Sequence, residues 1–67
     1  MIQAVLFDKS TWATTDARKF LKNHKLSPIK RVHITDNYLR YRINEPIHGA
    51  KYRMVDFGHD VKVIIEY

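Results

Sequence analysis

Cysteine is absent from this chain of 67 residues, and glycine and proline occur only twice each. Without cysteine there is no disulfide and no thiolate metal ligand, which is compatible with a reducing compartment. The chain is 45% hydrophobic, so we predict that it is folded throughout as a single compact domain over residues 1–67. We see no signal peptide and no apolar run approaching the roughly 18 residues of a membrane span, so we expect an intracellular protein with no membrane partner.

Acidic residues are scarce in the middle of the chain. The whole chain has 12 basic and 7 acidic residues, a net charge of +5. Between Arg18 and Arg42 lie eight basic residues and one acid, Asp36, so this stretch has a net charge of 8 − 1 = +7. This uneven distribution of charge favours anionic partners, nucleic acid first, although a solvated surface gives the same pattern.

The stretch Arg31–Ile43 reads as a hairpin. Apolar and polar residues alternate on both sides of Asp36-Asn37, which predicts two strands joined by a two-residue turn. The predicted pairs are Thr35 with Tyr38, Ile34 with Leu39, His33 with Arg40, Val32 with Tyr41 and Arg31 with Arg42. The last pair sets two positive charges opposite each other, which disfavours a strand pair, so this register is easier to explain if an anion lies against it.

The N-terminal part predicts a strand and a helix. The strand, Ile2–Phe7, is apolar on both faces and is therefore expected inside its sheet. The helix is expected to begin at Thr14 or Thr15, with a hydroxyl cap, and to end by Lys25. Its buried stripe comprises Ala17, Phe20, Leu21 and His24.

The C-terminal part predicts a loop and a second hairpin. Residues 44–50 read as the loop, and the strands 52–57 and 61–67 are joined by a three-residue turn, Gly58-His59-Asp60. The chain then reads β-α-β-β-β-β: an α+β fold with a small antiparallel sheet and one amphipathic helix packed on one face. If Val61–Tyr67 is an edge strand, it could pair with a second copy to form a homodimer.

Catalytic and metal-binding patterns are weak. The four histidines, His24, His33, His48 and His59, are separated by 9, 15 and 11 residues, which matches no local pair of zinc ligands. There is no phosphate-binding glycine loop and no carboxylate pair, although a histidine-assisted nuclease around His33 is conceivable. We therefore expect no enzyme, no metal and no cofactor. Trp12 is expected to fix its loop to the core.

The basic and aromatic face of the first hairpin is the main functional candidate. Arginine and lysine follow phosphates, and exposed aromatic rings stack on bases. We predict weakly sequence-specific contact with DNA or RNA. The alternative is a protein-interaction or virion-structural module, homodimeric or inhibitory, whose basic face meets an acidic protein. The predicted nucleic-acid-binding residues are Arg31, His33, Tyr38, Arg40 and Arg42, extended by Lys22 and Lys25.

The segments VLFDKSTW, ARKFLKNHKLSPIKRVHIT and NYLRYRI resemble a family of small uncharacterised proteins of large DNA viruses and tailed phages. The resemblance is best over residues 5–43 and implies a viral or phage origin, with a location in the host cytoplasm, the nucleus or the virion. It implies no activity for any residue. The part from Gly49 to Tyr67 departs from the family in being less basic, which weakens the inference that both hairpins contact one polyanion.

Overall fold

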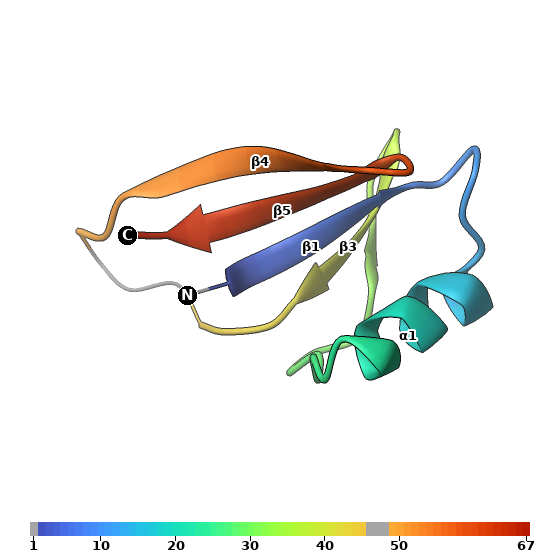
Figure 1. Ribbon diagram of the computed structural model, residues 1–67, viewed down its shortest axis with the longest axis horizontal. Helices are drawn as coiled ribbons and strands as arrows, with labels where there is room; N and C mark the ends of the chain where they lie inside the picture. Colours follow the sequence, from blue (N-terminus) through green and yellow to red (C-terminus); the bar gives the residue numbers. More distant parts are fainter. Residues whose placement is uncertain (1, 46–48) are drawn as a thin grey trace.

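The computed structural model describes residues 2–45 and 49–67 and confirms the predicted α+β fold. Five antiparallel strands form one sheet in the order β2-β3-β1-β5-β4, and one helix lies against one face of it (Figure 1). The open face is the side of the sheet away from this helix. The elements are β1 Ile2–Asp8, α1 Thr14–Asn23, β2 His33–Ile34, β3 Tyr38–Arg42, β4 Tyr52–Gly58 and β5 Val61–Glu66.

Strand β1 is the middle strand of the sheet, as its sequence predicts. It pairs with β3 on one side and with β5 on the other. Val5 and Phe7 are fully buried on the helix side, while Ala4 and Leu6 are buried on the open face. A strand that is apolar on both faces therefore occupies the position where both of its faces are covered.

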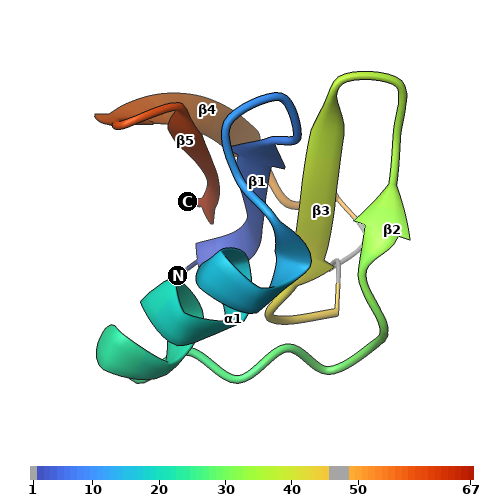
Figure 2. The same ribbon diagram turned by 90° about the vertical axis from the view of Figure 1, so that its right-hand side faces the viewer.

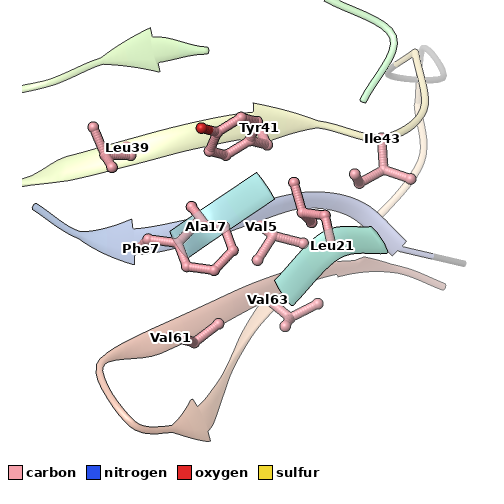
Figure 3. Packing of buried hydrophobic residues seen from close by; sticks show 9 residues of the cluster. All are labelled: Val5, Phe7, Ala17, Leu21, Leu39, Tyr41, Ile43, Val61 and Val63. Carbon is pink, nitrogen blue, oxygen red and sulfur yellow. The ribbon is translucent and has the colours of Figure 1, made fainter. Parts of the chain in front are cut away.

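The core lies between α1 and the sheet, and its centre is Phe7. Figure 3 shows side chains from α1, β1, β3 and β5 gathered there. The Phe7 ring lies 5.0 Å from Trp12, 5.5 Å from Phe20 and 5.6 Å from Tyr41, centroid to centroid. The last two contacts are edge-to-face, an arrangement that stabilises aromatic pairs beyond their buried area. The expected role of Trp12 in fixing its loop to the core is confirmed.

Helix α1 begins without the predicted hydroxyl cap. Thr14 is already the first helical residue, so the cap position falls on Ala13, which has no side-chain acceptor. Asp16 lies in the first turn, near the positive end of the helix dipole. Of the predicted stripe, Ala17 and Leu21 are buried and Phe20 is half-buried.

The helix ends in a Schellman motif. The amide of Leu26 donates to the Leu21 carbonyl at 2.8 Å, and the amide of Lys25 donates to the Lys22 carbonyl at 3.1 Å. Lys25 has φ 58°, in the left-handed region, and lies just past the helix instead of in its last turn. His24, the cap residue, is exposed and stacks against Phe20 at 4.3 Å.

The first hairpin has the predicted turn but is shorter than expected. The Thr35 amide donates to the Tyr38 carbonyl at 2.8 Å, and His33 faces Arg40 as predicted. The prediction that Arg31 faces Arg42 is wrong, because the amide of Ile29 donates to the Arg42 carbonyl at 2.9 Å. Residues 30–32 belong to no strand, so the predicted pair of Val32 with Tyr41 does not form either. The two arginine backbones are therefore not forced opposite each other.

The second hairpin turns on two residues instead of three. Gly58 is the last residue of β4, and the turn is His59-Asp60, with φ of 54° and 61°. Two successive residues at positive φ make a type I′ turn, which matches the twist of a hairpin. Gly58, at φ 93°, lies where the register of the two strands shifts, so it serves a bulge.

The prediction of a homodimer through the edge strand Val61–Tyr67 is wrong, because β5 lies between β1 and β4. Lys62, Ile64 and Glu66 of this strand are half-exposed. Interior strands also have half-exposed residues on the open face, because no second layer covers it. In the predicted loop 44–50, Pro46, Ile47 and His48 lie outside the described residues.

Candidate nucleic-acid interface

The structure divides the seven predicted binding residues between the two sides of the sheet. Tyr38, Arg40 and Arg42 lie on the open face, and His33 lies beside Arg40 at the sheet edge. The other three, Lys22, Lys25 and Arg31, line a groove on the helix side. The prediction that all seven form one surface is therefore wrong, because the hairpin face they were assigned to is opposite α1.

The arginines of the open face cover apolar residues. The register sets Leu6 between Arg40 and Lys62, and Ala4 between Arg42 and Ile64. Although no helix lies over this face, Ala4 is 0% exposed and Leu6 is 6% exposed. The long flanking side chains are themselves half-buried, so their aliphatic parts take the place of a second layer.

Two cations of the open face, Arg42 and Lys62, have acidic or phenolic neighbours, whereas the buried Nε of Arg40 has no hydrogen-bond partner within the described residues. Arg42 lies 3.9 Å from the Glu45 carboxylate. The Lys62 ammonium lies 5.6 Å from the Tyr38 ring centroid. A hydrogen bond to Tyr38, followed by the nearby charges of Tyr38, Asp56 and Asp8, raises the pKa of Lys62. This face is therefore a mixed surface in which the cations are partly neutralised.

A broad groove of about 1380 Å³ runs between α1 and residues 26–32. Figure 2 shows this segment leaving the end of α1 and passing along the bottom of the view to β2. Leu26 packs on the core, and the Ile29 amide is bonded to β3, so the segment is held at both points. Six cations line the groove: Arg18, Lys19, Lys22, Lys25, Lys30 and Arg31.

Helical spacing places the cations of one wall together. Arg18, Lys22 and Lys25 are separated by four and three residues, so the helix and its C-terminal motif present them on one side. Lys30 and Arg31 come from the opposite wall, just after the bond that fixes Ile29. All five side chains belong to exposed residues.

The groove contains no acid among its lining residues in the described part of the chain. Lys30 has a partner, Glu45, at 3.6 Å, but both side chains are more than half exposed, so the pair is weak. Burial raises the pKa of Tyr41, and the charge of Arg18 opposes that change, which indicates that Arg18 lies close to the floor of the groove. The groove is therefore an electropositive surface that the exposed Glu45 neutralises only weakly.

Three groove cations, Arg18, Lys19 and Lys30, are not among the residues predicted from sequence. A signal for them exists, since no acid occurs from Ala17 to Thr35 while six basic residues do. Periodicity within the hairpin instead selected the residues of the open face.

The described residues, 2–45 and 49–67, include no group of three His, Asp or Glu side chains able to hold a metal ion. His48, one of the four histidines considered above, lies outside them. In the same ranges, no helix has the length and apolar character needed to cross a membrane.

Comparison with protein-family models, with curated proteins and with solved structures finds no match to this chain. The resemblance to small viral and phage proteins therefore stays a prediction. The site is interpreted from its own geometry.

Proposed function

We propose that this protein binds nucleic acid, without catalysis, by receiving the phosphate backbone in the groove between α1 and residues 26–32. The observation that supports this most is the convergence of six cations from two walls with no acid between them. Phosphates attract Lys and Arg through charge, and release of their counterions drives binding. The viral or phage origin and a location inside the host cell or virion belong to the same proposal.

The size and lining of the groove suit a polyanion better than a small molecule. Small-molecule sites are usually apolar and measure about 300–1,000 Å³. This groove is larger and open, and six of its fifteen lining residues are cations. Its aromatic residue, Tyr41, is 3% exposed, so it provides no free ring for base stacking. We therefore expect contact with phosphates and weak sequence specificity.

The test is binding of labelled single-stranded DNA, duplex DNA and RNA, measured by fluorescence anisotropy at several salt concentrations. Four phosphate contacts would give a slope of roughly −3.6 for duplex DNA, and roughly −2.8 for a single strand, in a plot of log affinity against log salt. Lys22→Glu and Arg31→Glu should each weaken binding strongly, because each replaces a groove cation by an anion. Lys22→Ala should reduce the magnitude of the slope by about one.

Lys51→Glu is the matched control, because Lys51 is exposed beside β4, at the other end of the sheet. Lys22→Glu and Lys51→Glu both lower the net charge from +5 to +3, since each replaces +1 by −1. Equal loss in both variants would show a dependence on net charge alone and contradict a groove site. Loss only in the pair Arg40→Glu and Arg42→Glu would return the site to the open face. If the protein binds no nucleic acid but does bind an acidic protein, the protein-interaction alternative is favoured.

A further inference from the structure

A second cavity, of about 610 Å³, lies between α1 and the turn of the second hairpin. Figure 1 shows this turn and the loop that leads into α1 at the same end of the molecule. Trp12 and Phe20 supply aromatic surface to the cavity, and Asp16 and Asp60 supply carboxylates from its two walls. This cavity is termed the aromatic pocket. Its volume falls within the range of about 300–1,000 Å³ that is usual for sites of small ligands.

The aromatic pocket is held in shape by contacts among its own residues. The Trp12 indole donates to the His59 carbonyl, and its ring centroid lies 5.6 Å from that of Phe20, with the two planes at 82°. The Thr11 hydroxyl donates to Oδ2 of Asp60 at 2.8 Å, which orients that carboxylate. Trp12 and Phe20 are both half-buried, so each keeps part of its surface for a ligand. A site fixed in this way binds at a lower cost in side-chain ordering.

The charges of the aromatic pocket differ from those of the groove. Its lining has two carboxylates and one ammonium, that of Lys19, whereas the groove lining has six cations and no acid. Neither carboxylate forms an ion pair with any residue of the ranges 2–45 and 49–67. The groove therefore attracts phosphate and the pocket repels it, while a neutral aromatic ligand with hydrogen-bond donors suits the pocket.

Lys19 connects the two cavities, because it lines both of them. Asp16 and Phe20, four residues apart, share the side of α1 that faces the pocket. Arg18 and Lys22, also four residues apart, share the side that faces the groove. Helix α1 is thus the common wall, and a strand that leaves the groove reaches the pocket by crossing the helix at Lys19.

We propose that the aromatic pocket receives an unpaired nucleobase of a single strand whose phosphates lie in the groove, an inference that rests on the proposed function. Unpaired bases stack on aromatic side chains and form hydrogen bonds along their Watson–Crick edges. Carboxylates only accept hydrogen bonds, so they favour cytosine, adenine and guanine, whose exocyclic amino groups donate. Thymine and uracil have no amino group. The protein therefore prefers single strands to duplexes, and amino-bearing bases to thymine or uracil.

Trp12 is the one tryptophan of the chain, so its fluorescence reports on the pocket directly. The experiment titrates the full chain at neutral pH with oligo(dC), oligo(dT) and a duplex of equal length. Anisotropy of the labelled nucleic acid measures binding, and Trp12 emission measures stacking. We expect oligo(dC) to quench Trp12 and to bind about tenfold tighter than oligo(dT), and the duplex to bind without quenching. Oligo(rC) and oligo(rU) repeat the comparison for RNA.

Two double variants separate the pocket from net charge. Asp16→Asn with Asp60→Asn removes two negative charges from the pocket, and asparagine tolerates the φ of 61° at position 60. Asp36→Asn with Asp56→Asn removes two negative charges from exposed residues outside the pocket lining. Each double variant raises the net charge from +5 to +7, since 5 + 2 = 7. The pocket variant should lose most of the preference for oligo(dC), because an amide also donates and so accommodates thymine, and the control should keep it.

The outcomes separate the pocket from the groove. Binding of oligo(dC) without quenching of Trp12, or equal quenching by the duplex, would overturn the pocket and leave the groove in place. Equal affinity of the wild type for oligo(dC) and oligo(dT) would do the same, as would a preference retained by the pocket variant, once circular dichroism shows that it is folded. If no nucleic acid binds, the proposed function fails and this inference fails with it.

Discussion

The indole Nε1 of Trp12 donates a hydrogen bond of 2.8 Å to the backbone carbonyl of His59, 47 residues further along the chain. The same loop makes a second bond, from the Thr11 hydroxyl to the Asp60 carboxylate at 2.8 Å. These bonds join the connection between β1 and α1 to the turn of the second hairpin. The position of α1, and with it one wall of the groove, depends on that connection.

Trp12→Phe should lower the free energy of unfolding by about 1–2 kcal/mol. The substitution keeps an aromatic ring against Phe7 but removes the donor to His59 and part of the packed surface. Urea unfolding followed by circular dichroism gives the value. Tyr67→Phe is the control, because Tyr67 is 70% exposed and its change should stay within about 0.5 kcal/mol. Equal stability of Trp12→Phe and the wild type would show that the bond contributes nothing.

Lys25→Gly should stabilise the fold by about 1 kcal/mol. Lys25 is held at φ 58°, where a residue with a β-carbon is strained and glycine is not. The same substitution three residues earlier, Lys22→Gly, lies inside the helix and should destabilise by about 1 kcal/mol. Thermal or urea unfolding distinguishes the two signs. Destabilisation by both substitutions would argue against the Schellman geometry at the end of α1.

Asp8 should make stability depend on acidic pH. Hydrogen bonds from the hydroxyl and amide of Ser10 lower the pKa of Asp8 below its ordinary value. A lowered pKa in the folded state contributes stability above the unfolded pKa of about 3.9, and this contribution is lost as pH falls through the folded pKa.

Ser10→Ala should raise the Asp8 pKa measured by NMR, because it removes one of the two donors. Its stability should lie below that of the wild type at neutral pH, and the difference should shrink as the solution is acidified below about pH 4. If the difference in stability between Ser10→Ala and the wild type is the same at all pH values, Ser10 stabilises the fold independently of the charge of Asp8.

Much of the fold could be predicted from local pattern. The strand 2–7, apolar on both faces, indicated the central strand, and Asp36-Asn37 indicated the turn between β2 and β3. Both predictions succeeded because burial and turn formation depend on neighbouring residues. Strand order could not be obtained, since it depends on which backbone edges meet. The prediction for Val61–Tyr67 therefore failed even though its alternation was interpreted correctly.

The candidate site was predictable in composition but not in place. Alternation in β3 identified Arg40 and Arg42 as one face, and the structure agrees. Sequence alone could not show that these side chains cover Ala4 and Leu6, or that α1 lies against the other face. Charge counting found the basic region, but the fold decided which of its cations converge.

The most direct test of the central claim is an NMR titration of isotopically labelled protein with DNA and RNA at low and high salt. We expect chemical-shift changes concentrated at residues 18–31, with Arg18, Lys22 and Arg31 among the largest, and the loss of these changes at high salt. Changes concentrated at Tyr38, Arg40, Arg42 and Lys62 would contradict the groove and favour the open face. No changes with any nucleic acid at low salt would contradict nucleic-acid binding itself.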